Sequence, residues 1–263
     1  MLKGLGESYR MSTLKESAHK STHKEFPRVL RMKKGDEKGM RKLEAVIFDL
    51  DGVITDTAEY HYLAWKELGE SIGIPFDREF NEKLKGISRM DSLELILAKE
   101  NRQNDFTPAE KEELATRKNA QYGELIKQVT AADLLPGIAA LLEELRNAGL
   151  KIAMASASKN AFAVTESLGV MGYFDHIVDA ATVKKSKPDP EVFLKAAKAI
   201  GVSPENCVGI EDAAAGVEAI LSAGMIAVGI GDARTLGEAN VVLPTTKELN
   251  LAVIEEVFCK CLV

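Results

Sequence analysis

The sequence predicts an α/β protein whose core is a Rossmann-like, doubly wound parallel sheet, that is, a sheet covered by helices on both faces. From Pro136 onward, helical patterns alternate with short apolar runs, as in "IAALLEELRNAGL" followed by "KIAMASAS". Such alternation is typical of parallel sheets. Between the first apolar run and Pro136, residues 58 to about 132 have long helical periodicity instead. This stretch indicates an α-helical cap inserted after the first strand.

Composition limits the class of function. The chain has 263 residues, of which 46% are hydrophobic, and this is enough for one large domain or two unequal ones. A net charge of −6 argues against a body that binds nucleic acid and favours a small-molecule substrate. The three cysteines leave one unpaired under any bridging scheme, which fits a reducing cytoplasm. No apolar run approaches the length of a membrane span, so we expect no membrane partner.

Residues 1–42 differ from the rest of the chain, with twelve Lys or Arg against five Asp or Glu. A basic arm of this kind can bind nucleic acid or acidic lipid. However, Met40 followed by "RKLEAVIFDLDG" looks like a natural start placed directly before a first strand. We therefore expect a basic, mobile N-terminal extension and no nucleic-acid partner. The core domain is expected over 43–56 and 134–263, with the cap domain over 57–133.

The first strand, expected over residues 43–48, ends in two aspartates separated by one residue. Asp49 and Asp51 are followed at once by Gly52, which lets the chain turn out of the strand. Asp51 can therefore lie beside Asp49 and take a different role. We expect Asp49 to attack phosphorus as the nucleophile and Asp51 to move a proton to and from the substrate oxygen.

Later strands also end in polar residues. Ser156 and Ser158 follow "KIAMA", Glu211 and Asp212 follow "CVGI", and Lys187 lies in the loop "KKSKPDP". Because ligands bind beyond the carboxyl ends of parallel strands, these side chains should meet in one crevice. Asp49, Asp51, Glu211 and Asp212 would repel one another without a cation, and an all-oxygen set suits Mg²⁺. Magnesium and Lys187 together predict a phosphoryl group as the substrate.

Four segments, "DLDGVITDT", the serine at a later strand end, the isolated lysine before "PDP", and "GIEDAAAG", resemble the four motifs of the haloacid dehalogenase superfamily. Within residues 43–263, the insert resembles the cap of the beta-phosphoglucomutases through "TDTAEYHYLAWK" and "NEKLKGISRMDSLE". This resemblance implies interconversion of β-D-glucose 1-phosphate and β-D-glucose 6-phosphate through bound β-glucose 1,6-bisphosphate and a phosphorylated Asp49. One departure is Ala213, where relatives often carry a serine or another polar residue, and the outer shell of the metal site depends on such residues.

The cap supplies further candidates. Thr57 and His61 are four residues apart at the start of a helix, so they share a face. By the resemblance, this pair and Lys85 govern whether Asp51 turns toward a bound sugar. Arg89 in "KGISR" can hold the distal phosphate with its planar fork, and Gly86 permits a close backbone approach. The candidate substrate-binding residues are Thr57, His61, Trp65, Lys85, Gly86, Arg89, Ser92, Ser156, Ala157, Ser158, Lys159, Asn160 and Lys187.

Two rival functions use similar residues. A sugar-phosphate phosphatase on the same scaffold would use Asp49 and Asp51 but let water attack the aspartyl phosphate. A receiver-like phosphoacceptor domain also has an acidic cluster, a lysine and Mg²⁺, but it needs an open face, and the large cap argues against it. We therefore expect a monomeric, cytoplasmic phosphomutase that takes a sugar phosphate.

Overall fold

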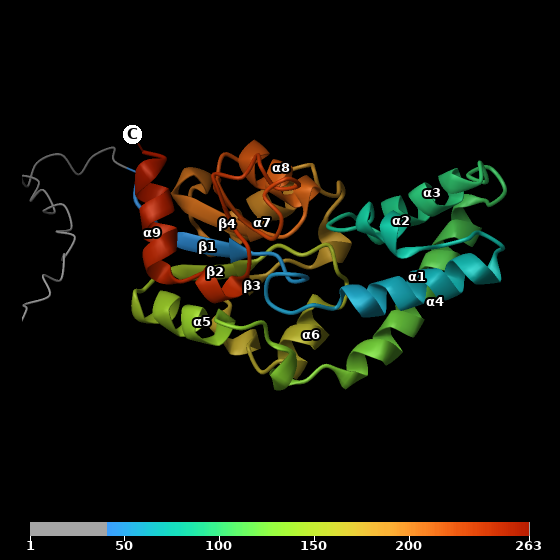
Figure 1. Ribbon diagram of the computed structural model, residues 1–263, viewed down its shortest axis with the longest axis horizontal. Helices are drawn as coiled ribbons and strands as arrows, with labels where there is room; N and C mark the ends of the chain where they lie inside the picture. The colour runs from blue at the N-terminus through green and yellow to red at the C-terminus, as the bar shows by residue number, and fades with distance from the viewer. Residues whose placement is uncertain (1–40, 263) are drawn as a thin grey trace, which may run out of the picture. The chain divides into compact units, whose positions relative to one another are not determined.

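A computed structural model describes residues 41–262 of the chain (Figure 1). The predicted extension over 1–42 therefore lies outside the described residues, apart from its last two. Within the described part, no helix is both long and apolar enough to cross a membrane. The strands are β1 (Ala45–Phe48), β2 (Lys151–Met154), β3 (His176–Ile177), β4 (Cys207–Glu211), β5 (Ile226–Ile230) and β6 (Val241–Leu243).

The helices alternate with these strands after β2 and form a continuous run before it. The α-helices are α1 (Ala58–Ser71), α2 (Arg78–Glu82), α3 (Arg89–Lys99), α4 (Pro108–Leu125), α5 (Ile138–Asn147), α6 (Ala161–Ser167), α7 (Glu191–Ile200), α8 (Ala214–Ser222) and α9 (Leu251–Lys260). Short 3₁₀ helices are η1 (Ile126–Gln128), η2 (Ala131–Asp133), η3 (Met171–Tyr173), η4 (Ala180–Thr182), η5 (Pro204–Asn206) and η6 (Thr246–Glu248).

The strands form one parallel sheet in the order β3-β2-β1-β4-β5-β6. Val46 and Phe48 of β1 face a hydrophobic cluster that includes side chains of α5 and α9. Ala45 and Ile47 face the opposite cluster, which is built with α7 and α8. Both faces of the sheet are therefore covered, and the predicted doubly wound α/β class is confirmed.

Helices α1 to α4 pack around a hydrophobic cluster of their own, which is separate from the two clusters on the sheet. Its buried members include Trp65 and Leu68 of α1, Ile96 of α3 and Leu114 of α4. In Figure 1 these helices gather beyond the end of the sheet toward which β1 points. We refer to α1–α4 as the cap helices, and they stand over the carboxyl ends of the strands.

Two connections join the cap helices to the sheet, and they lie side by side. The Thr55 hydroxyl donates to the carbonyl oxygen of Asp133 at 2.8 Å, and the Leu135 amide donates to the carbonyl of Ile54 at 2.9 Å. Thr55 is fully buried. The outgoing and returning chains are thus bonded to each other where the cap begins.

Candidate active site

The strand register brings the acidic residues together. Phe48 of β1 pairs with Ile210 of β4, so the next residues, Asp49 and Glu211, lie beside each other at the carboxyl ends. Oxygen atoms of Asp49, Glu211 and Asp212 all lie within 4.8 Å of one another. The predicted convergence of these three carboxylates is therefore present in the structure.

Lys187 is the cation placed against this acidic cluster. Its Nζ donates to Asp49 Oδ1 at 2.5 Å and to Glu211 Oε2 at 2.7 Å, and the side chain is buried. Burial opposes a charge on Lys187, but the Asp49 and Glu211 carboxylates outweigh it and raise the pKa of this lysine. The lysine thus stays protonated and holds both carboxylates in place.

One lysine leaves the acidic cluster short of positive charge. Burial and the charge of Asp49 raise the pKa of Glu211 to about 7. Burial and the charges of Glu211 and Asp49 also raise the pKa of Asp212 well above its usual value. These raised pKa values reflect burial and repulsion among the carboxylates, which a divalent cation would relieve. The all-oxygen donor set also suits a hard metal ion. The residues present therefore fit a metal site.

Gly52 is required beside this cluster for two reasons. Its φ of +73° is disfavoured for other residues. In addition, a Cβ on Gly52 would lie 2.3 Å from Asp212 Oδ2, so a side chain would displace the carboxylate. The turn that was predicted to release Asp51 from the strand also makes room for the acidic cluster.

Asp51 has a different environment from Asp49. Its carboxylate accepts a hydrogen bond from the Thr57 hydroxyl, and its Oδ2 lies 3.8 Å from His61 Nε2. Burial and the charge of Asp49 raise the pKa of Asp51 to about 6, while the Thr57 hydrogen bond opposes this shift. Asp51 does not belong to the set of three close carboxylates, so its assignment as a metal ligand stays a prediction. A carboxyl group with a pKa near 6 is suited to acid and base catalysis.

A partly buried polar network links Asp51 to the cap helices. Tyr122 OH and Thr57 Oγ1 are 2.9 Å apart, and because the Thr57 proton goes to Asp51, the tyrosine donates here. Lys118 Nζ lies 2.9 Å from His61 Nδ1. When Lys118 is protonated it has no lone pair and must donate this hydrogen bond, and the proton of neutral His61 then lies on Nε2, facing Asp51.

Lys118 and Tyr122 were missed by the sequence analysis. Lys118 lies in α4 on a stripe of buried residues with Leu114, Ala115 and Tyr122. A lysine on the buried stripe of an amphipathic helix is unusual, and this was the signal that could have found it. Burial lowers the pKa of Lys118 to about 7, and the nearby Arg89 adds to the effect while Asp51 opposes it.

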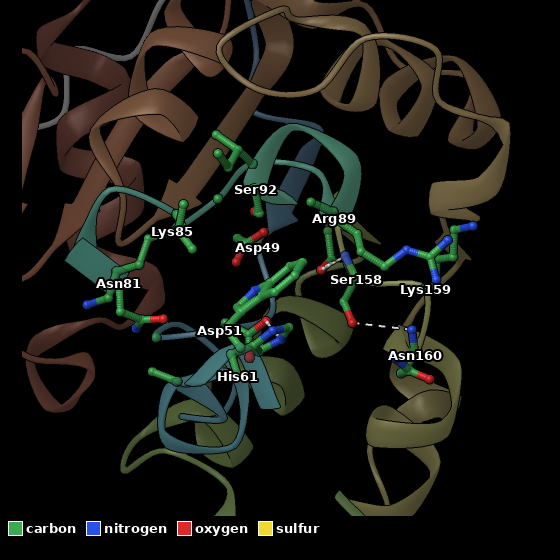
Figure 2. A pocket seen from close by; sticks show the side chains of 18 of the residues that line it. Asp49, Asp51, His61, Asn81, Lys85, Arg89, Ser92, Ser158, Lys159 and Asn160 are labelled. Atoms are coloured by element: carbon green, nitrogen blue, oxygen red, sulfur yellow. Dashed lines mark hydrogen bonds and ion pairs between the residues drawn. The ribbon is translucent and has the colours of Figure 1, made fainter. Parts of the chain in front are cut away.

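A cavity of about 180 Å³ lies between the cap helices and the strand ends. Figure 2 shows side chains from both sides of this cavity, with Arg89 and Ser92 from α3 and Ser158, Lys159 and Asn160 from the loop after β2. The predicted residues that line it are Asp49, Asp51, His61, Trp65, Lys85, Gly86, Arg89, Ser92, Ser156, Ala157, Ser158, Lys159, Asn160 and Asp212.

Three predicted residues do not line the cavity but contact residues that do. Thr57, Lys187 and Glu211 are absent from the lining and act through their bonds to Asp51 and Asp49. Conversely, Asn81 and Asn119 of the cap line the cavity without having been predicted. Asn160 Nδ2 donates to Asn119 Oδ1 at 3.0 Å, which connects the cap helices to the loop after β2.

The cap also touches the strand ends where both sides are small. A Cβ on Gly86, whose φ is +74°, would lie 3.2 Å from the Cβ of Ala213 and 3.8 Å from Lys187 Cδ. Ala213, where the sequence departs from its relatives, is therefore the residue of the strand ends against which the cap loop packs. Its amide donates to Glu211 Oε1 at 3.1 Å.

The parallel α/β core, the capped cavity and the acidic cluster with its lysine define a phosphoryl-transfer class of site. The haloacid dehalogenase-like hydrolase family model matches residues 43–224, and the chain belongs to this family. It is 52% identical over 214 residues to the beta-phosphoglucomutase of Bacillus subtilis, a match that covers 81% of this chain and 95% of that protein.

Two further relatives carry names that describe different activities. The crystal structure of beta-phosphoglucomutase from Clostridium difficile is similar with a TM-score of 0.82 and 49% identity, over 83% of this chain and 98% of that one. A phosphorylated carbohydrates phosphatase of Thermotoga maritima is 32% identical, over 82% of this chain and all of that protein. The family thus includes both a mutase and a phosphatase among the relatives of this chain.

Proposed function

We propose that this chain is a beta-phosphoglucomutase, which interconverts β-D-glucose 1-phosphate and β-D-glucose 6-phosphate. The observation that carries the proposal is the 52% identity to the Bacillus subtilis enzyme over 95% of its length. Two features of the structure support it. Asp49 and Asp51 have separate environments suited to separate roles, and a cap closes over them with its own cationic residues.

In the proposed reaction, phosphorylated Asp49 transfers its phosphoryl group to the C6 hydroxyl of β-glucose 1-phosphate, and Asp51 accepts the hydroxyl proton. This gives β-glucose 1,6-bisphosphate and a free Asp49 carboxylate. The intermediate then turns round, Asp49 attacks the phosphorus at C1, and Asp51 returns the proton to the departing oxygen. The products are glucose 6-phosphate and phosphorylated Asp49, so the enzyme is regenerated.

Lys187 and the proposed metal share the task of balancing charge at Asp49. Lys187 lies 2.5 Å from the Asp49 carboxylate and would orient it toward phosphorus. We assign Asp49, Glu211 and Asp212 as the residues that hold Mg²⁺, which when bound would screen the phosphoryl oxygens. Glu211 is itself held by Lys187 and by the backbone amide of Ala213.

The cap residues would keep water from the aspartyl phosphate until a sugar hydroxyl is present. Thr57 and the His61–Lys118 pair hold Asp51 on the cap side, so the position of Asp51 depends on the position of the cap. Arg89 would bind the phosphate that is not being transferred. This assignment treats 57–133 as the cap domain and 43–56 with 134–263 as the core, with the whole reaction carried out by one chain.

The test supplies β-glucose 1-phosphate, Mg²⁺ and β-glucose 1,6-bisphosphate and follows glucose 6-phosphate and inorganic phosphate together. A mutase gives glucose 6-phosphate with little free phosphate. The second candidate, a sugar-phosphate phosphatase, is favoured by the similarity to the Thermotoga maritima enzyme and would give free phosphate at the rate of substrate loss. Asp49→Asn is the matched control, because an amide cannot accept the phosphoryl group and both products should disappear.

A further inference from the structure

Arg89 is already engaged by acceptors of α4. Its Nη2 donates to Glu112 Oε1 at 2.8 Å and its Nη1 donates to the carbonyl oxygen of Ala115 at 3.2 Å. Its Nε is buried and has no hydrogen-bond partner among the described residues. A buried N–H without an acceptor is costly. The two contacts with α4 hold the guanidinium in place, and the Nε–H is the buried donor that still lacks an acceptor.

Glu112 differs from Arg89 in its exposure. The arginine side chain is 13% exposed, whereas that of Glu112 is 54% exposed. The carboxylate can therefore move into water at little cost, while the arginine stays in the cavity wall. Lys118, which also lines the cavity, is close enough for the charge of Arg89 to depress its pKa. Arg89 and Lys118 thus make this wall of the cavity cationic, and Glu112 neutralises part of that charge although it does not line the cavity.

We propose that Glu112 competes with the non-transferring phosphate of the substrate for Arg89, and that it is a determinant of how tightly this phosphate is held. The inference rests on the proposed function, since it assumes that Arg89 faces a phosphate. A phosphate dianion offers oxygens to Nε and to the Nη atoms at once. As it binds, Glu112 gives up its contact with Nη2, and it takes the contact back when the phosphate leaves.

Such competition suits a mutase in particular. The bisphosphate must turn round within each catalytic cycle, so the phosphate at Arg89 must be released and replaced by the other one. An arginine without a counter-ion would hold a dianion longer. The neighbouring carboxylate offers the guanidinium an alternative partner, which lowers the cost of letting the phosphate go.

The experiment measures phosphate binding at Arg89 itself. Inorganic phosphate is titrated into the isotope-labelled full chain with Mg²⁺ present, and NMR follows the Nε–H signal that is missing from Arg89→Lys. In Glu112→Gln, the dissociation constant read from this signal should fall by about two- to fivefold, the range expected when one partly exposed ion pair is removed. The turnover number and KM for β-glucose 1-phosphate should fall together, because release becomes slower.

Glu113→Gln is the matched control, since Glu113 is exposed on the same helix and forms no ion pair within residues 41–262. It removes the same charge and should leave the dissociation constant unchanged. Equal or weaker phosphate binding in Glu112→Gln would overturn the proposal, as would equal tightening in Glu113→Gln or an Arg89 signal that ignores phosphate. Failure of the proposed function would appear separately, as absence of glucose 6-phosphate from the wild-type enzyme.

Discussion

Lys118 carries its amino group at a place where burial disfavours a charge. The side chain is 4% exposed and its Nζ lies 4.7 Å and 4.8 Å from the ring centres of Trp65 and Tyr122. Cation–π contacts and the hydrogen bond to His61 compensate only part of the lost hydration. Burial of Lys118 therefore lowers the stability of the fold, while its amino group contacts a residue of the candidate site.

Replacing Lys118 with methionine should raise stability and lower activity. Because the folded-state pKa is about 7 and the usual value is 10.5, the unfolded chain binds more protons between these two values. The free energy of unfolding should therefore rise from about pH 7 to pH 10.5 in the wild type, and the penalty is fully present below pH 7. Lys118→Met should lack this contribution and be more stable near pH 7 by about 2 to 4 kcal/mol.

Urea unfolding across this pH range, together with the turnover number, checks the prediction. Turnover should drop about tenfold or more, because His61 loses the donor that fixes its tautomer. Lys127→Met is the control, since Lys127 is an exposed residue paired with Glu124, and it should change neither the pH dependence nor the activity. A Lys118→Met variant that is less stable at pH 7 would show that the lysine stabilises the cap.

Gly86 lies where the cap loop meets the strand ends. In Gly86→Ala, the new Cβ would lie 3.2 Å from that of Ala213, and the positive φ adds about 1 kcal/mol of strain. We expect kcat/KM to fall about tenfold, because relief of this contact would shift the cap loop by a few tenths of an ångström and a misplacement of about 1 Å can cost about a hundredfold. Gly73→Ala is the matched control, with a φ of +71° and no atom within 4 Å of the new Cβ. It should lose similar stability and keep its activity, and an equal loss of activity in both variants would refute the role of the contact.

At the scale of elements, the paired connections around Thr55 join the cap helices to the sheet. Replacing Thr55 with valine keeps the shape but removes the hydrogen bond to the Asp133 carbonyl. The loss should cost about 1 to 3 kcal/mol, and kcat/KM should fall because the cap is placed less accurately. Thermal unfolding and the mutase assay measure the two effects.

Thr165→Val is the comparison for the Thr55 variant. Thr165 is equally buried, and its hydroxyl donates to the carbonyl of Ala161 within α6. It should lose stability without a matching loss of kcat/KM. If the two variants behave alike in both measurements, the Thr55 bond has no special part in placing the cap.

The elements differed in how far the sequence could predict them. The four strands β1, β2, β4 and β5 come from apolar runs that are buried on both faces, and these runs were recognised. Strands β3 and β6 were not, because they are only two and three residues long and lie at the two edges of the sheet. Their pairing depends on a neighbouring strand already in place, which a local pattern does not reveal.

In the candidate site too, local sequence patterns predict some residues but not the contacts that depend on long-range packing. Asp49 and Glu211 could be predicted because each lies at the carboxyl end of a strand, and Lys187 because it belongs to a recognisable motif. In a parallel sheet such residues meet at the carboxyl ends of the strands. The contacts of Arg89 with Glu112 and of Lys118 with His61 could not be predicted. They depend on how α1, α3 and α4 pack against one another, and helical periodicity fixes which face is buried but not which residues meet.

At the scale of the whole molecule, every assigned site residue lies between Asp49 and Asp212. We therefore predict that a chain starting at Met40 keeps nearly the same kcat/KM and melting temperature as the full chain. Parallel assays and thermal unfolding of the two proteins test this. A large loss of either property would show that residues 1–39 contribute to the enzyme, and the interpretation of this basic segment as a dispensable extension would be withdrawn.

The position of Trp65 gives the molecule an optical probe of its own. It is the single tryptophan of the chain, it lines the cavity, and the amino group of Lys118 lies over its ring. Indole emission responds to nearby charge and to water, so ligand binding and cap movement should both change the fluorescence of the unlabelled enzyme. The same signal, followed through neutral pH, would record when Lys118 loses its proton.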